Sequence, residues 1–171
     1  MSKSSLKQNH QGKKTGQAGK NSKTREETDA LGKIAVPAEN YAGAFTERAR
    51  KNFQISGQKA PEEFKKSLGL IKIASAQANE KLGLLDKKIT NAIQMAAEEF
   101  IEGRFDDEYD LDLFQAGAGT PFNMNANEII ANRANEILRG QKGKYEFVHP
   151  NNHVNRSQSS NDVIPTAIRL T

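Results

Sequence analysis

Two polar stretches organise this chain: Gln115-Ala116-Gly117-Ala118-Gly119-Thr120-Pro121-Phe122-Asn123-Met124-Asn125 and His149-Pro150-Asn151-Asn152-His153-Val154-Asn155-Arg156-Ser157-Gln158-Ser159-Ser160-Asn161-Asp162. Each stretch gathers neutral hydrogen-bond donors just ahead of a predicted helix. The free N–H groups and the positive dipole end of a helix N-terminus favour an anion. The two stretches therefore predict binding of a carboxylate or a phosphate.

Hydroxyl and amide side chains are the best candidates for holding that anion, because all of them can donate to one carboxylate. The candidates are Thr120, Ser159, Ser160 and Asn161. The glycines beside Thr120 allow the backbone to approach a ligand closely. Serine and asparagine are also the ordinary capping residues of helices, and glycines are typical of tight turns, so a purely structural role stays open.

The charge of the chain is unevenly distributed. The net charge over 171 residues is +4, but the first 24 residues hold six lysines and no acid, so they carry +6 and the remainder carries −2. We expect residues 1–24 to form a disordered basic tail, because their few apolar side chains cannot offset the entropy of ordering. The folded part is therefore not expected to bind nucleic acid specifically.

The cellular location of the protein is predicted from three features: signal peptide, membrane span and cysteine content. The basic tail has no apolar core of a signal peptide, and no later stretch approaches the ~20 apolar residues that span a bilayer. The chain has no cysteine, which excludes disulfides and thiol catalysis. We expect a cytoplasmic protein without membrane contact.

The apolar pattern predicts one modest, mainly α domain. Apolar residues recur every three or four positions over several segments, as on the buried face of a helix. The predicted helices cover residues 61–84, 86–103, 125–140 and 160–171, with a short helical turn at 46–52. Only residues 111–114 and 145–148 alternate as a strand would, and residues 141–159 are expected to form a loop.

Three helix starts carry capping patterns. Asp86 is expected to cap the second long helix. Asn125 and Glu128 have the spacing of a capping box for the third. Ser160 or Asn161 is expected to cap the last helix, with Pro165 in its first turn.

No metal or cofactor is expected. His149 and His153 lie four residues apart, but the proline and asparagines around them are unlike a helix that would align both rings on zinc. Gly117-Ala118-Gly119 lacks the third glycine of a dinucleotide-binding fingerprint, because Phe122 stands there.

Four motifs in order and at matching spacing give the chain a family resemblance. They are Thr46-Glu47-Arg48-Ala49, Asn52-Phe53-Gln54-Ile55-Ser56-Gly57, the stretch from Gln115 to Asn132, and the stretch from His149 to Ala167. From about Thr24 to Thr171 the chain resembles the N-terminal part of the aspartate ammonia-lyase and class II fumarase superfamily. The resemblance implies a lyase N-terminal domain at residues 25–159 and the truncated start of a central helical bundle at 160–171.

The resemblance also implies an enzyme that eliminates ammonia or water from a four-carbon dicarboxylate to give fumarate. It implies substrate-carboxylate binding by Thr120, Ser159, Ser160 and Asn161, with Ala118 and Gly119 close to the substrate. It places a secondary dicarboxylate site at His149, Asn151 and Asn152. No residue of this chain matches the family's catalytic base or acid, and the family forms homotetramers that build each site from three subunits. We therefore expect this fragment to be inactive alone.

The motifs divide between two members of the superfamily. Ala118, the pair Gln115-Ala116 and His153 are similar to aspartases, which favours an aspartate ammonia-lyase acting on L-aspartate. His149-Pro150 and Ser159-Ser160 are closer to fumarases, so a fumarase acting on malate or fumarate is the alternative. A third possibility is a noncatalytic chain that binds dicarboxylates or docks on other subunits through its last apolar helix.

Overall fold

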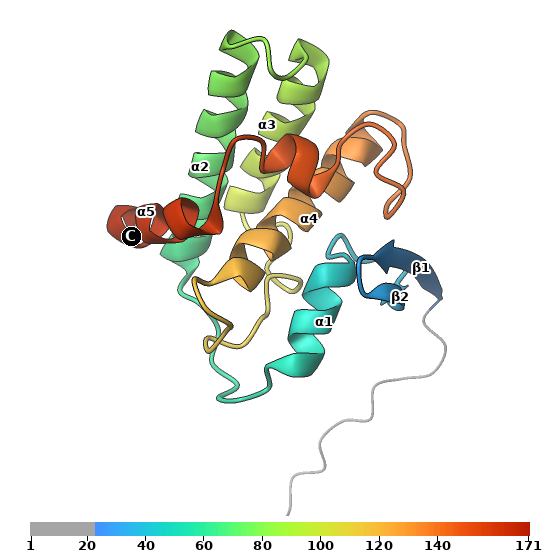
Figure 1. Ribbon diagram of the computed structural model, residues 1–171, viewed down its shortest axis with the longest axis vertical. Helices are drawn as coiled ribbons and strands as arrows, with labels where there is room; N and C mark the ends of the chain where they lie inside the picture. Colours follow the sequence, from blue (N-terminus) through green and yellow to red (C-terminus); the bar gives the residue numbers. More distant parts are fainter. Residues whose placement is uncertain (1–22) are drawn as a thin grey trace, which may run out of the picture.

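Residues 23–171 are described by a computed structural model, and they form a mainly α structure with one small β hairpin (Figure 1). The elements in chain order are β1 (Thr24–Asp29), β2 (Gly32–Pro37), α1 (Ala44–Asn52), α2 (Glu62–Lys81), α3 (Lys87–Ile101), α4 (Thr120–Ile137), the π-helix η1 (Pro150–Val154) and α5 (Ser160–Leu170). The predicted mainly α class is confirmed. The predicted disordered tail lies outside the described residues except for its last two, and Thr24 already belongs to β1.

Helices α2 and α3 lie antiparallel to each other, joined by a short turn at one end of the molecule (Figure 1). The turn contains Gly83, whose φ of +71° is accessible to glycine. Asp86 then accepts a hydrogen bond from the N–H of Lys88 at 2.7 Å, which confirms the predicted cap of α3. The two helices approach closely because Gly69 has no side chain; a Cβ there would lie 2.5 Å from Ile101 Cγ1.

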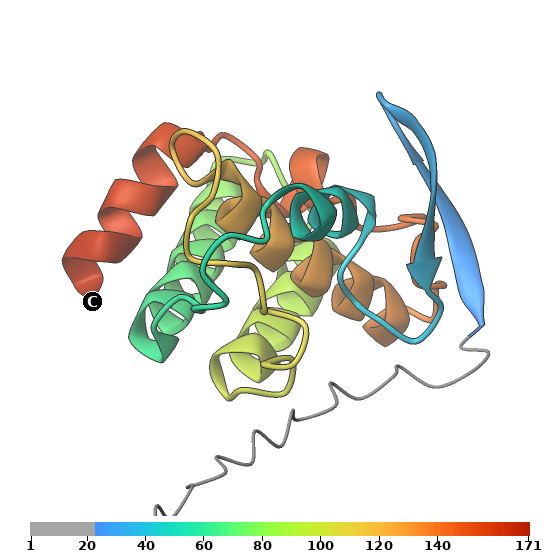
Figure 2. The ribbon, with the colours of Figure 1, turned by 90° about the horizontal axis from the view of Figure 1, so that it is seen from below.

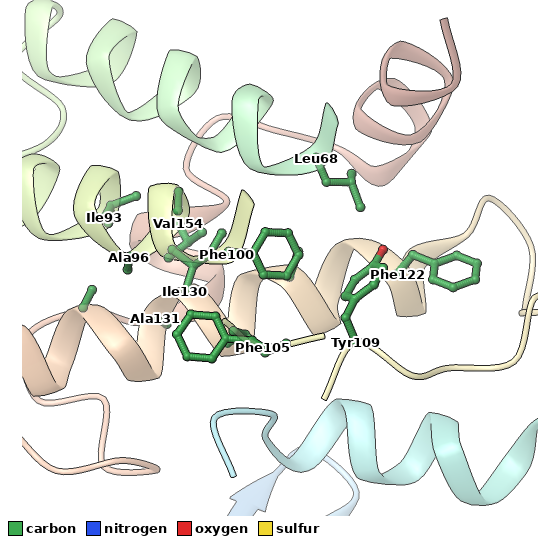
Figure 3. Packing of buried hydrophobic residues seen from close by; sticks show 14 of the residues in the cluster. Leu68, Ile93, Ala96, Phe100, Phe105, Tyr109, Phe122, Ile130, Ala131 and Val154 are labelled. Carbon is green, nitrogen blue, oxygen red and sulfur yellow. The ribbon is translucent and has the colours of Figure 1, made fainter. Parts of the chain in front are cut away.

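The apolar core lies where α2, α3 and α4 meet (Figure 3). Aromatic rings fill much of it: the centroids of Phe64 and Phe122 are 5.7 Å apart, and those of Phe100 and Tyr109 are 5.4 Å apart, each pair edge to face. Edge-to-face contact is favourable because the positive ring edge meets the negative face. This core fixes α4, which carries the first polar stretch, against the other helices.

Helix α4 is buried over most of its length, although it is not an apolar helix. Fourteen of its 18 residues are buried. Its asparagines hold loops on either side: Asn132 donates to the carbonyl of Tyr41 at 2.7 Å and accepts from the N–H of Gly143 at 2.7 Å. Asn135 donates to the carbonyl of Val148 at 2.6 Å. The helix therefore organises the surrounding chain through polar as well as apolar contacts.

The start of α4 differs from the prediction. The helix begins at Thr120 rather than near Asn125, after Gly119 in the left-handed conformation with φ of +71°. Asn125 and Glu128 form no capping box, because both lie inside the helix and are buried. Glu128 instead accepts from the N–H groups of Gly43 and Thr46, each at 3.0 Å, and so caps α1.

The sequence patterns also misplaced the strands. The hairpin β1–β2 was not predicted, and it stands to one side of the helices, against α1 (Figure 2). Arg25 anchors it by donating to the carbonyls of Pro37, Ala38, Asn40 and Ala42. The two segments with strand-like alternation, 111–114 and 145–148, form no strand: Asp112 forms only an isolated bridge with Lys59, and 145–148 lies in the expected loop.

Candidate functional site

The fold brings the two polar stretches together at the starts of α4 and α5. Asn123, in the first turn of α4, donates from Nδ2 to Ser160 Oγ at 2.9 Å. Gly119 faces α5, since a Cβ built on it would lie 3.3 Å from Ile164 Cγ2. The absence of a side chain at Gly119 therefore lets the two helix starts approach.

Ser159 is the cap of α5, one residue before the predicted position. Its Oγ accepts from the N–H of Asn161 at 3.2 Å. The side chains of Ser160 and Asn161 are consequently not used as caps, and Asn161 is exposed whereas Ser160 is half-buried. Pro165 lies in the second turn rather than the first, so it has no N–H to offer the carbonyl of Asn161.

Thr120 is the first residue of α4, and Asn123 lies one turn further along the same face. The Thr120 side chain lines a cavity of about 300 Å³ together with Arg48 and Asp29. Arg48 is paired with Asp29 at 2.8 Å, so the positive charge in that cavity is balanced. Ala118 is exposed in the loop before the helix.

The His149 segment forms η1, inside the predicted loop. The N–H groups of Asn151 and Asn152 donate to His149 Nδ1 at 3.1 and 3.3 Å. The N–H of His149 in turn donates to His153 Nδ1 at 2.7 Å. Partial burial lowers the pKa of both imidazoles. Because both Nδ1 atoms accept hydrogen bonds from backbone N–H groups, the neutral rings carry their proton on Nε2.

The predicted site residues do not share one pocket. Gly119 lines an apolar cavity of about 440 Å³, Thr120 the cavity beside Arg48, and His149 with Asn151 a third of about 270 Å³ that also contains Glu27 and Glu128. Within residues 23–171, no three histidine, cysteine or acidic side chains are grouped as metal ligands would be.

Lys72 is a polar residue of this region that the sequence patterns missed. Its side chain is fully buried, and Nζ donates to Asn123 Oδ1 at 2.7 Å, Gln158 Oε1 at 2.9 Å and Asn155 Oδ1 at 3.0 Å. Burial lowers the pKa of Lys72 to about 7. The available signal was its spacing, since Lys72 lies four residues after the buried Leu68 on α2.

Fold and site together define a helical domain that presents uncharged hydrogen-bond donors at the adjoining starts of α4 and α5. The model of the family described as Lyase matches residues 32–171. The chain belongs to this lyase family, within the aspartase and class II fumarase superfamily. In the described part of the chain no helix combines the length and apolar character of a membrane span.

Known relatives support this membership at the level of sequence and structure. The chain is 52% identical over 147 residues to fumarate hydratase class II 2 of Bradyrhizobium diazoefficiens, covering 86% of this chain and 31% of the relative. It is similar to the crystal structure of a class II fumarase from Schistosoma mansoni, with a TM-score of 0.83, 43% identity, and coverage of 86% of this chain and 31% of that one. It is also similar to a Brucella melitensis protein described as fumarate lyase:delta crystallin, with a TM-score of 0.83, 45% identity, and coverage of 86% and 34%.

The preference for an aspartate ammonia-lyase is wrong. Relatives at about half identity are named fumarate hydratases, and a structural neighbour is named a class II fumarase. Ala118 was a weak guide, because it is exposed in the loop before α4. The chain spans about a third of the length of the curated relatives that it matches.

Proposed function

We propose that this chain supplies substrate-binding residues to a class II fumarase, which adds water reversibly to fumarate to give L-malate. The observation that carries the proposal is the junction of the two helix starts, where Asn123 contacts Ser160 at 2.9 Å. The names and the 52% identity of the relatives support the choice of fumarate and malate. Homotetrameric assembly and a domain boundary near residue 160 belong to the same proposal.

In this proposal the start of α5 binds one carboxylate of the substrate. Ser159, Ser160 and Asn161 donate hydrogen bonds to it, and the positive end of the α5 dipole attracts its charge. Thr120 donates from the start of α4, while Ala118 and Gly119 allow close approach. Hydroxyl and amide donors strengthen as negative charge accumulates on that carboxylate during proton removal from the adjacent carbon, so they favour the transition state.

A second dicarboxylate-binding position is proposed at His149, Asn151 and Asn152. The exposed amide side chains of the two asparagines can donate to a carboxylate, and the neutral His149 ring can donate from Nε2. None of these residues is proposed as the base that removes the proton.

The proposal can be tested by grafting. Residues 24–171 replace the matching segment of the Bradyrhizobium diazoefficiens fumarate hydratase, and the graft is assayed with L-malate, fumarate and L-aspartate. We expect interconversion of fumarate and malate, and no fumarate from L-aspartate. Ser160→Ala should lower kcat/KM by about 10-fold or more, because a hydrogen bond to a charged group is lost.

Ser75→Ala is the matched control, because it removes a hydroxyl from α2 that belongs to neither helix start. Its kcat/KM should stay within about twofold of the unsubstituted graft. A graft that releases fumarate from L-aspartate but not from L-malate overturns the proposal. A correctly assembled graft that is inert towards both overturns it as well.

A further inference from the structure

Lys72 is a buried charged residue for which the proposed function has no role. Its ammonium group contacts three amide oxygens, and no carboxylate is among its hydrogen-bond partners within residues 23–171. A buried cation without an anion opposes folding, because desolvation is not balanced by an opposite charge. Stability alone therefore does not explain a lysine at this position.

The lysine determines how the neighbouring amides are oriented. An ammonium group only donates, so the oxygen of each contacting amide must face it. The oxygen of Asn123 is held by Lys72 at 2.7 Å, which leaves its Nδ2 directed at Ser160 Oγ, 2.9 Å away, and at Asn155 Oδ1, 3.2 Å away. Gln158 is oriented in the same sense, since its Nε2 donates to the carbonyl of Val154 at 2.9 Å.

This orientation decides the direction of the hydrogen bond at Ser160. Because Asn123 donates to Ser160 Oγ, the Ser160 hydroxyl keeps its own proton for another acceptor. If the Asn123 amide were reversed, its oxygen would face Ser160 and accept a hydrogen bond from the Ser160 hydroxyl. Ser160 would then have no proton to donate to a ligand.

We propose that Lys72 is a positioning residue that acts through Asn123 to hold the Ser160 hydroxyl as a hydrogen-bond donor to the substrate carboxylate. The inference rests on the proposed function, because it requires that Ser160 binds the dicarboxylate. Lys72 itself does not touch the substrate. It acts on affinity through the chain of contacts from ammonium to amide to hydroxyl.

A double-mutant cycle on the full 171-residue chain tests this coupling. Fumarate is titrated into the chain and into Lys72→Met, Ser160→Ala and the double variant, with binding followed by two-dimensional amide NMR. We expect Ser160→Ala to weaken binding by about 10-fold and Lys72→Met by about 5-fold. In the Ser160→Ala background, Lys72→Met should weaken binding by less than about twofold. A long-range attraction between Lys72 and fumarate acts in both backgrounds and cancels from the cycle.

A second variant keeps the test decisive if Lys72→Met does not fold. Asn123→Asp preserves a partner for Lys72 but carries only acceptor oxygens, so it should accept a hydrogen bond from the Ser160 hydroxyl. Its effect on fumarate binding should be smaller in the Ser160→Ala background, where only the repulsion between the new carboxylate and fumarate remains. In either cycle, an equal loss in both backgrounds refutes the positioning role and leaves the proposed function standing.

The failure of the proposed function gives a different pattern. If the isolated chain shows no saturable response to fumarate, the same cycle is measured as kcat/KM in the fumarate hydratase graft. Equal binding, or equal kcat/KM, of Ser160→Ala and its unsubstituted parent refutes carboxylate binding by Ser160. The inference about Lys72 then falls with it. The side-chain amide signal of Asn123 is an independent readout: if Lys72→Met folds and leaves that signal unshifted, Lys72 does not orient the amide.

Discussion

Replacing Glu128 with glutamine should destabilise the folded chain, although the two side chains have the same shape. The Glu128 carboxylate is buried and accepts from the N–H of Phe45 at 2.9 Å through Oε1. Through Oε2 it accepts from the N–H groups of Gly43 and Thr46, and from Thr46 Oγ1 at 2.6 Å. A glutamine oxygen can replace Oε2, but its NH2 group would then face the N–H of Phe45 as a second donor.

The expected loss follows from that contact. One hydrogen bond to a charged acceptor contributes about 1.5–3 kcal/mol. Burial raises the pKa of Glu128, so removing its charge recovers part of the desolvation cost. We therefore expect Glu128→Gln to lower the free energy of unfolding by about 2 kcal/mol, and Glu128→Ala, which leaves all these donors unpaired, by about 4 kcal/mol.

Urea unfolding followed by far-UV circular dichroism measures both values, with an unchanged m-value showing that the transition is comparable. The exposed Glu146 provides the control, and Glu146→Gln should change stability by less than about 0.5 kcal/mol. If Glu128→Gln were no more destabilising than Glu146→Gln, the reasoning that Glu128 caps α1 would be refuted.

Asp112 and two glycines give further tests. Backbone hydrogen bonds, the largest from Phe114, hold the pKa of Asp112 well below its usual 3.8, so its stabilising effect is present above that pH and is lost as the pH falls further. Asp112→Asn should therefore show a flatter loss of stability in acid-unfolding curves, and an unchanged curve would contradict this. Gly83→Ala should lower the free energy of unfolding by about 1 kcal/mol, because alanine disfavours the left-handed φ of +71°. Gly119 has the same φ, but a methyl group there would also press on Ile164 in α5. The melting temperature of Gly119→Ala should therefore be lower than that of Gly83→Ala. Equal melting temperatures would show that close approach of the two helix starts does not require a glycine at position 119.

Features stabilised by near neighbours in sequence were predictable. Asp86 caps α3 through an N–H only two residues away, so its pattern was sufficient. The Glu128 pattern failed because its partners lie in α1, more than 80 residues earlier. The hairpin was missed for a similar reason: its first strand is highly charged, and Arg25 anchors it to carbonyls 12 to 17 residues away.

In the candidate site, too, features that depend on near neighbours in sequence were predictable and those that depend on distant segments were not. Ser159, Ser160 and Asn161 could be selected because donors at a helix start are visible in sequence. Lys72 could not be assigned a role, because its three acceptors come from two other segments of the chain. Spacing on α2 indicates that Lys72 is buried, but only the packing of α2 against α4 and the turn after η1 shows what it contacts.

The asparagines of α4 determine how the molecule should open. Asn132 and Asn135 hold the loops around Tyr41, Gly143 and Val148, so detaching either loop breaks hydrogen bonds of buried amide side chains. Such an opening costs about 1–3 kcal/mol for each buried polar group that it leaves unpaired. Native-state hydrogen exchange should therefore find these loop amides exchanging together with α4, as one cooperative unit. A polar helix at the centre is thus expected to slow exchange in the irregular segments that its asparagines hold.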